Sequence, residues 1–465
     1  IPDEAYTKYN PEGEEILPGN LVNGWHNTAV TVRPAEGYTI ARDKVTNAYG
    51  DSVVFGDGES KKGDQGEKSR IIYLRNEDGG ITAPITIDLY KLDNEKPYDL
   101  HIHFPEPVLH TQDKVKYYDG EITVVFTAKD DTSGVDRFCW SYVSLDGAGS
   151  APETVRGELE AQRDKEDPTR YTASLTLPGK EAAQLRGRLE VSVRDAAGND
   201  SDILRDDAIF VVDTIAPERT VTYGLQDAGG TSQTLGRKHY FSGSVDFAFQ
   251  IEEANFFAED VHITVSKDGG AALEQTVTWE SAGIPGAYVA GLTLSDDGEY
   301  VVGMTYTDRS GNEMPSYTSE IIVVDATAPV IEFNYDDYSG EKPQTATITV
   351  TEHNFRQSDI AVTTEAKTIT DQDVTVEDLQ EYLRNCRWEH EGDVHRAYLS
   401  DQFADAIYVL TCNYNDLALN PAAEVRTEPF VVDHTPPSAD RMSVSYSASV
   451  KDTVLSAITL GFYNP

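Results

Sequence analysis

The sequence is poor in cysteine and in long apolar runs. Only 3 of its 465 residues are cysteines, so a disulfide framework does not hold the architecture together. No stretch approaches the roughly 18 consecutive apolar residues of a membrane-spanning helix, and we expect no membrane insertion within this sequence. Cys386 and Cys412 fall in one expected domain, where they would either form a disulfide or remain two thiols.

Basic residues and catalytic motifs are scarce as well. The chain carries 38 Lys and Arg against 80 Asp and Glu, a net charge of −42, and a field of this sign repels nucleic acids and anionic membrane surfaces. There is no Gly-x-Ser-x-Gly elbow, His-Glu-x-x-His motif, Walker loop or Cys-x-x-Cys pair, and the 10 histidines lack metal-ligand spacing. We therefore expect no enzymatic activity, no nucleic-acid partner and no required cofactor.

What the sequence does contain is a repeat. The phrase Val-Val-Asp, with a proline four residues after the aspartate, occurs at Asp213, Asp325 and Asp433, and a weaker copy surrounds Asp93. The copies recur about every 110 residues, the length of one small domain. Each copy is typical of a β-strand end that runs into a connector stiffened by proline. We call these residues the connector aspartates.

A turn motif precedes each connector aspartate. It occupies residues 76–80, 195–199, 308–312 and 416–420, and its fourth position is Gly except in the last copy, which has Leu419. Asp or Asn opens such turns by bonding to backbone amides, and Gly adopts the positive φ that they need. The strands before the last two turns begin near Tyr300 and Tyr408, in a pattern that resembles the tyrosine corner of immunoglobulin-type sandwiches.

These signals, with period-two alternation and turns roughly every 8–12 residues, predict an all-β fold of tandem immunoglobulin-like β-sandwiches in an elongated, monomeric rod. Residues Thr375 to Arg384 predict a short capped helix inserted in the fourth sandwich. The predicted domains are residues 1–97, 98–216 (divergent, with an insert), 217–328, 329–436 (with the helical insert) and 437–465, the truncated start of a fifth unit.

Two of these domains resemble the bacterial Ig-like repeats of large surface proteins from Gram-positive gut bacteria. In domain 4 the resemblance rests on Glu352–Phe355, Trp388 and Asp416–Asn420, and in domain 3 on Glu253–Phe256 and Trp279. Domain 1 resembles another variety of these repeats, and domain 2 departs most because it lacks the Glu-x-Asn-Phe phrase. The resemblance implies an extracellular location, on the cell surface or secreted, and an architecture more than an activity.

Three functions fit this reading. The first is a non-catalytic stalk or spacer of an adhesin or cell-wall protein that also offers a host-contact surface. The second is a surface protein that binds a host protein such as an immunoglobulin, as a superantigen does. The third is an accessory region of a large secreted glycoside hydrolase. The partners expected are host extracellular proteins or glycans, and the inserts in domains 2 and 4 favour the binding hypothesis.

The repeats also predict where acidic side chains gather. In an Ig-like sandwich the first strand starts at the end that carries the B–C and F–G loops, so each connector aspartate should lie beside those loops of the next domain. Carboxylate and amide oxygens are the ligands that Ca²⁺ prefers. The candidate calcium ligands are therefore Asp213, Glu253, Asn255 and Asp308 at one boundary, Asp325, Glu352, Asn354 and Asp416 at the next, and Asp93, Asp130 and Asp195 at a third. Alternatively, these residues cap turns and bond to linker amides without a metal.

A separate candidate binding surface lies in domain 2. Phe138, Trp140 and Tyr142 alternate along one predicted strand and therefore share a face. By comparison with residues 261–265 of domain 3, the Cys139 face should lie in the core and the aromatic face outside, where exposed aromatic side chains mark contacts with sugars or proteins. The alternative is the reverse facing, with Trp140 as the buried tryptophan of the sandwich.

Overall fold

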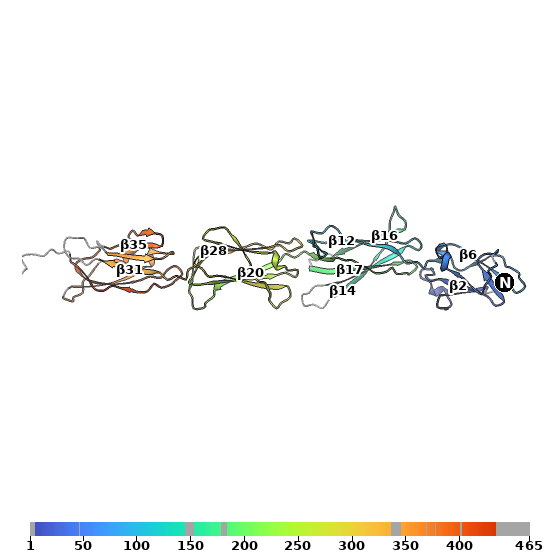
Figure 1. The fold of residues 1–465 in the computed structure, drawn as a ribbon, viewed down its shortest axis with the longest axis horizontal. Coiled ribbons are helices and arrows are strands. Elements are labelled where there is room, and N and C mark those ends of the chain that lie inside the picture. The colour runs from blue at the N-terminus through green and yellow to red at the C-terminus, as the bar shows by residue number, and fades with distance from the viewer. Residues whose placement is uncertain are drawn as a thin grey trace, which may run out of the picture.

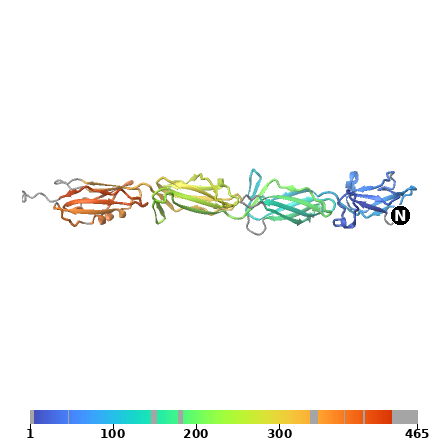
Figure 2. The ribbon, with the colours of Figure 1, turned by 90° about the horizontal axis from the view of Figure 1, so that it is seen from below.

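Four β-rich parts follow one another along the chain and form an elongated rod (Figure 1, Figure 2). The structure is a computed structural model, and it describes residues 5–45, 47–144, 153–177, 184–335, 346–368, 370–376, 378–399 and 402–433. We name the parts units 1 to 4 by their strands, which are β1–β8, β9–β19, β20–β30 and β31–β38. The predicted fifth unit at residues 437–465 lies outside the described residues.

Unit 1 pairs its strands in three small sheets, ordered β1-β2-β4, β3-β6-β7 and β5-β8. Its strands are β1 (Tyr6–Tyr9), β2 (Val30–Pro34), β3 (Tyr38–Ala41), β4 (Val53–Phe55), β5 (Gly66–Glu67), β6 (Arg70–Asn76), β7 (Ile85–Ile87) and β8 (Lys91–Leu92). Three short helical turns complete it: η1 (Pro18–Asn20), η2 (Gly58–Ser60) and α1 (Lys61–Asp64).

Unit 2 stacks a large sheet, ordered β10-β11-β19-β17-β13-β14 with β18 beside β17, on a sheet ordered β15-β16-β12-β9. Strand β11 runs parallel to β19, and the other pairs are antiparallel. The strands are β9 (Tyr98–His103), β10 (Leu109–His110), β11 (Val115–Tyr118), β12 (Ile122–Lys129), β13 (Val135–Ser144), β14 (Thr154–Glu160), β15 (Gln162–Arg163), β16 (Arg170–Leu177), β17 (Gln184–Asp195), β18 (Leu204–Arg205) and β19 (Ile209–Asp213).

Unit 3 repeats this topology, with sheets ordered β21-β22-β30-β28-β24-β25 and β20-β23-β27-β26, and β22 again runs parallel to β30. The elements are β20 (Glu218–Leu225), β21 (Ser232–Leu235), β22 (Lys238–Phe241), β23 (Val245–Glu252), η3 (Ala258–Asp260), β24 (Val261–Lys267), β25 (Leu273–Gln275), β26 (Glu280–Ser281), β27 (Ala287–Leu294), β28 (Gly298–Tyr306), β29 (Tyr317–Thr318) and β30 (Ile321–Val324).

Unit 4 has two four-stranded sheets. One is ordered β31-β32-β35-β34, and in the other β33, β37 and β38 all pair with β36. The elements are β31 (Val330–Tyr335), β32 (Ala346–Thr351), η4 (Gln357–Asp359), β33 (Ala361–Lys367), α2 (Leu379–Asn385), β34 (Glu389–Glu391), β35 (Val394–Tyr398), β36 (Ala406–Asn413), β37 (Val425–Arg426) and β38 (Phe430–Val432).

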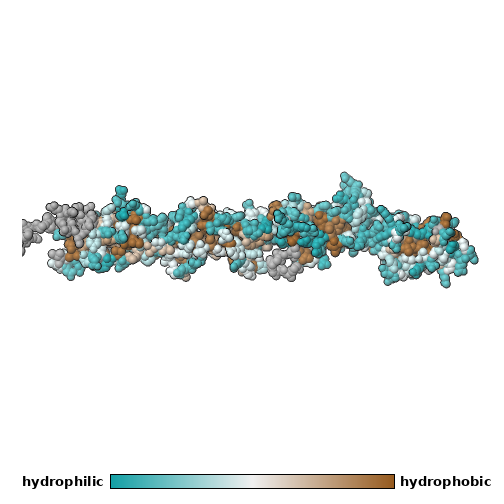
Figure 3. Space-filling model, in the orientation of Figure 1, coloured by the Kyte–Doolittle hydropathy of each residue, from teal (hydrophilic) through white to brown (hydrophobic). Residues whose placement is uncertain are grey.

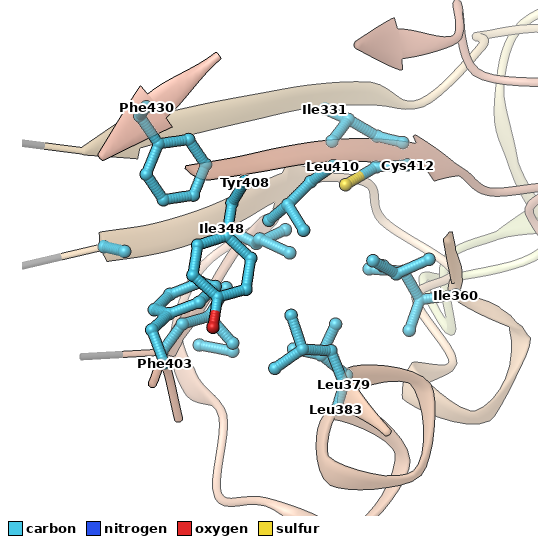
Figure 4. Packing of buried hydrophobic residues seen from close by; sticks show 14 of the residues in the cluster. Ile331, Ile348, Ile360, Leu379, Leu383, Phe403, Tyr408, Leu410, Cys412 and Phe430 are labelled. Atoms are coloured by element: carbon cyan, nitrogen blue, oxygen red, sulfur yellow. The ribbon is translucent and has the colours of Figure 1, made fainter. Parts of the chain in front are cut away.

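Each unit encloses its own hydrophobic cluster. In unit 4, Ile348 of one sheet faces Leu410 of the other, and helix α2 covers the end of the cluster with Leu379 and Leu383 (Figure 4). Cys412 fills a core position in the same cluster as a free thiol, and Cys386 is also free. Burial of side chains of this size contributes about 1.5–3 kcal/mol each, so each unit has a core of its own to stabilise it.

The inserted helix of unit 4 is confirmed, with a later start than the sequence predicts. Helix α2 begins at Leu379, and the side chain of Asp378 caps it by accepting hydrogen bonds from the amides of Gln380 and Glu381. Thr375 therefore lies outside the helix. An aspartate satisfies the free amides of a first helical turn as well as a threonine does, and the predicted motif contains both Thr375 and Asp378.

The repeated turns and tyrosines have the predicted contacts. The phenol of Tyr300 donates to the carbonyl of Asp296 at 2.7 Å, and that of Tyr408 donates to the carbonyl of Ala404 at 2.9 Å. In the turn of unit 3, Gly311 has φ +98°, whereas Leu419 takes the same position in unit 4 with φ +68°. A side chain with this φ is strained, so the last turn adopts its shape at some cost.

The aromatic side chains of unit 2 face the core, which is the second of the two facings that the sequence allows, and not the exposed one. Phe138 and Tyr142 are buried in the core, and Trp140 packs against the same cluster, so this set is not an exposed binding surface. The strand pairing gives the reason: Trp140 lies opposite Val191 of β17, as Ile263 lies opposite Met304 of β28 in unit 3. The aromatic side chains therefore match the inward-facing residues of unit 3, and a comparison shifted by one residue exchanges the two faces.

The visible face of the rod is mainly hydrophilic, and its apolar residues lie in small patches separated by hydrophilic ones (Figure 3). Among the described residues, no helix is long and apolar enough to cross a membrane.

Candidate metal centres between successive units

Each boundary between units brings three buried carboxylates together. We call these sets the first triad (Asp93, Asp130, Asp195), the second triad (Asp213, Glu253, Asp308) and the third triad (Asp325, Glu352, Asp416). In each triad one oxygen from every residue lies within 4.8 Å of the others. The structure therefore gathers the acidic residues that the sequence predicts, each from a connector and two loops of the following unit.

The local fold explains why the second triad converges. Asp213 is the last residue of β19, Glu253 follows β23 directly, and Asp308 lies two residues beyond β28. The side chain of Asn312 links the connector to the turn. Its amide nitrogen donates to the backbone carbonyl of Asp213 at 2.9 Å and to Oδ2 of Asp308 at 2.8 Å. This asparagine closes the turn and fastens it to the connector.

The same fastening occurs at the other two boundaries. Asn420 donates to the carbonyl of Asp325 at 2.7 Å and to Asp416 at 2.7 Å, and Asn199 donates to the carbonyl of Asp93 at 3.0 Å and to Asp195 at 2.8 Å. Our sequence analysis did not select these three asparagines. Their signal was visible, because each ends a repeated turn motif, but only the fold shows that their amides reach the connector.

The predicted ligands Asn255 and Asn354 serve the triads as hydrogen-bond donors. Each side-chain amide nitrogen contacts the connector aspartate, at 2.8 Å from Asp213 and 2.7 Å from Asp325. Their backbone amides donate to the glutamate two residues earlier at 2.6 Å in both units. At the first boundary the connector aspartate, Asp93, accepts a hydrogen bond from the backbone amide of Ser133 instead, at 2.9 Å.

Burial makes these carboxylates costly to ionise. It raises the pKa of Asp195 to about 6 and that of Glu352 to about 7. The pKa of Glu253 is also raised, first by burial and then by the neighbouring charges of Asp213 and Asp308. Clustered like charges in a site of low dielectric repel strongly, so each triad favours either a bound proton or a bound cation.

The donor set fits a hard divalent cation. Carboxylate oxygens with nearby backbone and amide oxygens are the ligands of Ca²⁺, which accepts six to eight of them in flexible geometry. The three acids of each triad supply the charge, and the adjoining asparagines present their side-chain amide nitrogens to these acids. The same residues cap turns and bond to the connector, which is the metal-free alternative that the sequence leaves open.

Apolar contacts between units support two of the three triads. Phe257 of unit 3 packs against Tyr117 and Val211 of unit 2. At the next boundary Leu417 and Ala418 of unit 4 pack on unit 3, and their carbonyls accept hydrogen bonds from Gln233 and Thr231, at 2.6 Å and 2.8 Å respectively. The turn that supplies Asp416 is therefore held against the preceding unit by side chains as well as by the acids.

The third triad borders a cavity of about 670 Å³ between units 3 and 4. Asp297 lines it with Asp325, Glu352, Asp268 and Asp393. Burial raises the pKa of Asp325, the charge of Asp297 raises it further, and the hydrogen bond from Asn354 lowers it. This cavity gives solvent and ions a route to the triad.

His101 and His103 lie on one face of β9 with ring centres 5.9 Å apart. His101 contacts Asp99, and His103 contacts Thr127.

Comparisons with known proteins give little guidance on function. No family model and no curated protein matches the chain. The solved structures that it is similar to include dimeric latent PorU from Porphyromonas gingivalis, with 13% identity and a TM-score of 0.19 over 77% of this chain. A hypothetical protein from Parabacteroides merdae has 12% identity and a TM-score of 0.17 over 72% of this chain and 98% of its own. The chain spans 35% of the PorU length.

Proposed function

We propose that this chain is a non-catalytic, extracellular spacer of a bacterial surface protein, in which calcium clamps each boundary between tandem Ig-like domains. The proposed domains are residues 1–97, 98–216, 217–328 and 329–436. The observation that carries the proposal is the triple occurrence of a buried carboxylate triad between successive units. A clamp at each boundary would stiffen a chain of small domains into a rod, which suits a spacer.

Strand order supports the Ig-like assignment. In Ig-type sandwiches one sheet has the order A-B-E-D and the other contains C-F-G. Unit 2 has β9-β12-β16-β15 in one sheet and β13-β17-β19 within the other, which is the same order. Unit 3 repeats it with β20-β23-β27-β26 and β24-β28-β30. Unit 2 fits the pattern although its sequence departs most from the repeats.

Small-angle scattering tests the spacer role. A compact globule of this length would have a radius of gyration of about 23 Å, and we expect a much larger value. On calcium addition, the largest particle dimension should increase or its distribution should become narrower. A variant in which the connector aspartates of the three triads, Asp93, Asp213 and Asp325, are replaced by alanine should show a broader distribution of lengths in calcium. Equal distributions for the two proteins, with and without chelator, would contradict the clamp.

Host binding is a second candidate function, and strands β14 and β15 of unit 2 favour it. These strands lie at the two sheet edges, and every other side chain of β14 is exposed. Exposed strand edges are templates for partner strands. Retention of an immunoglobulin or another host protein by the intact chain, and its loss when residues 154–170 are replaced by a short linker, would support this function over a pure spacer.

A further inference from the structure

Two histidines of unit 4 point the same ring atom at each other. His390 and His395 lie directly opposite on the antiparallel strands β34 and β35, and their Nδ1 atoms are 2.7 Å apart. Two imidazole Nδ1 atoms cannot both donate a hydrogen, so one ring must present its lone pair to the other. The strands join through a hairpin at Gly392, which brings the two residues together.

The other nitrogen of His395 settles which ring presents the lone pair. Nε2 of His395 lies 2.7 Å from the backbone carbonyl of Glu352. A carbonyl only accepts, so Nε2 carries the hydrogen and Nδ1 of the neutral ring carries the lone pair. A backbone carbonyl that fixes the tautomer in this way is the usual outer partner of a metal-binding histidine.

Packing holds the His395 ring in position. Its side chain is 8% exposed, and it stacks on Phe355 with ring centres 4.3 Å apart and an angle of 13°. His390 is exposed, so its ring can move slightly and a cation can approach from its side. Burial also lowers the pKa of His395, which keeps the ring neutral at physiological pH.

We propose that His390 and His395 form a binding site for a late first-row divalent cation, of the Zn²⁺ or Cu²⁺ class. Imidazole nitrogen is a preferred ligand of these ions. Two nitrogens at the usual 2.0–2.1 Å from Zn²⁺ lie roughly 3.3 Å apart in tetrahedral geometry, so a small movement of the exposed ring opens the space. Water fills the remaining positions, and the site is chemically distinct from the oxygen-only triads.

Binding needs no net release of a proton when both rings are neutral. His390 moves its hydrogen from Nδ1 to Nε2, and both Nδ1 lone pairs then face the cation. This inference does not rest on the proposed spacer function.

Unit 3 supplies matched control substitutions. Tyr288 occupies the position of His395 and stacks on Phe256 with centres 4.2 Å apart, and Ser281 lies opposite it on the neighbouring strand. The variants His395→Tyr and His390→Ser therefore copy an arrangement that this fold already contains. His262→Ser is the comparison variant, because this exposed histidine of unit 3 pairs with Glu274.

The test is titration of the full chain with Cu²⁺ and with Zn²⁺ at pH 7.5, in saturating calcium so that the triads do not compete. We expect one equivalent of metal to be lost, or bound more than about tenfold more weakly, in both His395→Tyr and His390→Ser but not in His262→Ser. The electron paramagnetic resonance spectrum of the Cu²⁺ protein should show two nitrogen ligands that either substitution removes. Equal stoichiometry and affinity in wild type and both variants would overturn the proposal, as would a Cu²⁺ spectrum without coupled nitrogens.

Discussion

The second and third triads have the same three types of acid at matching positions, but the residue beside each triad is different. Next to the second triad stands Gln184, whose amide donates to both carboxylate oxygens of Glu253, at 3.2 Å and 3.3 Å, and it pairs with Asp213 in the sheet. In unit 3 the matching strand pair, β28 with β30, ends with Gly298 opposite Val324. Asp297 is the residue just before Gly298. The repeat thus retains acids of the same types, while the neighbouring residue is a neutral amide at the second triad and a carboxylate at the third.

This difference bears on what each boundary holds. The neutral amide of Gln184 adds no charge to the second triad. The carboxylate of Asp297 adds a fourth negative charge at the third, where it accepts hydrogen bonds from the amide of Ala326 and the hydroxyl of Thr327. The third triad should therefore depend more strongly on a cation than the second does, and its cavity makes exchange easier.

The largest expected effect is the loss of stability with rising pH when calcium is absent. Glu352 has a folded-state pKa of about 7, raised by burial, whereas the unfolded chain has the ordinary value near 4.3. The folded state thus holds the proton more tightly, so this contribution to stability is present below pH 4 and disappears as the pH rises to about 7. A shift of this size corresponds to about 4 kcal/mol.

Denaturant unfolding in chelator at pH 5 and pH 8 measures this effect. Glu352→Gln, which copies the protonated acid, should flatten the dependence, and Glu253→Gln should do the same for the second boundary. If Glu352→Gln retained the full decline between the two pH values, the pKa of this residue would not be the cause.

Calcium should restore what rising pH removes. A ligand that binds only the folded state adds about 2.7 kcal/mol at a hundredfold excess over its dissociation constant. The unfolding midpoint in calcium relative to chelator should therefore increase at pH 8 and change less at pH 5, where Glu352, with its pKa of about 7, is protonated. Asp416→Asn should abolish the part that belongs to the third boundary. An increase of the same size at both pH values would argue against exchange of protons for calcium.

Substitutions of Gln184 and Asp297, the residues beside the second and third triads, should change the calcium affinities of the two triads in opposite directions. Asp297→Asn should weaken calcium at the third triad by about tenfold, or about 1.4 kcal/mol, because one nearby charge is lost. Gln184→Glu should tighten calcium at the second triad by a similar factor and destabilise that boundary in chelator. Calorimetric titration of the two variants checks both directions, and unchanged affinities would show that these neighbours do not tune the triads.

The smallest expected effect concerns the turns. Leu419 takes a left-handed conformation, φ +68°, that Gly311 supplies in unit 3. The left-handed conformation costs a side-chain-bearing residue about 1–2 kcal/mol, and the greater freedom of glycine in the unfolded chain offsets part of that. Leu419→Gly should therefore stabilise unit 4 by up to about 1 kcal/mol in thermal unfolding. Gly311→Leu is the reverse control and should destabilise unit 3.

The sequence was sufficient to predict the triads because their positions follow from order along the chain. Once a connector aspartate ends one sandwich, the loops of the next must lie beside it, and Asp308 and Asp416 sit in those loops. The outward facing of Phe138 was wrong because the comparison with residues 261–265 was shifted by one residue: Phe138 follows Asp130 at the same spacing as Val261 follows Glu253, and the strand pairing makes them equivalent. His390 and His395 were missed because their pairing depends on the register of a hairpin, which spacing alone does not reveal.

The central claim is that each triad holds one calcium ion, and calorimetric titration of calcium into the chelator-treated full chain at pH 7.5 tests it most directly. The account predicts three bound ions per chain, one for each triad, and the loss of one ion in each of Asp93→Asn, Asp213→Asn and Asp325→Asn. Titration without binding heat, or a stoichiometry that these three substitutions leave unchanged, would contradict it.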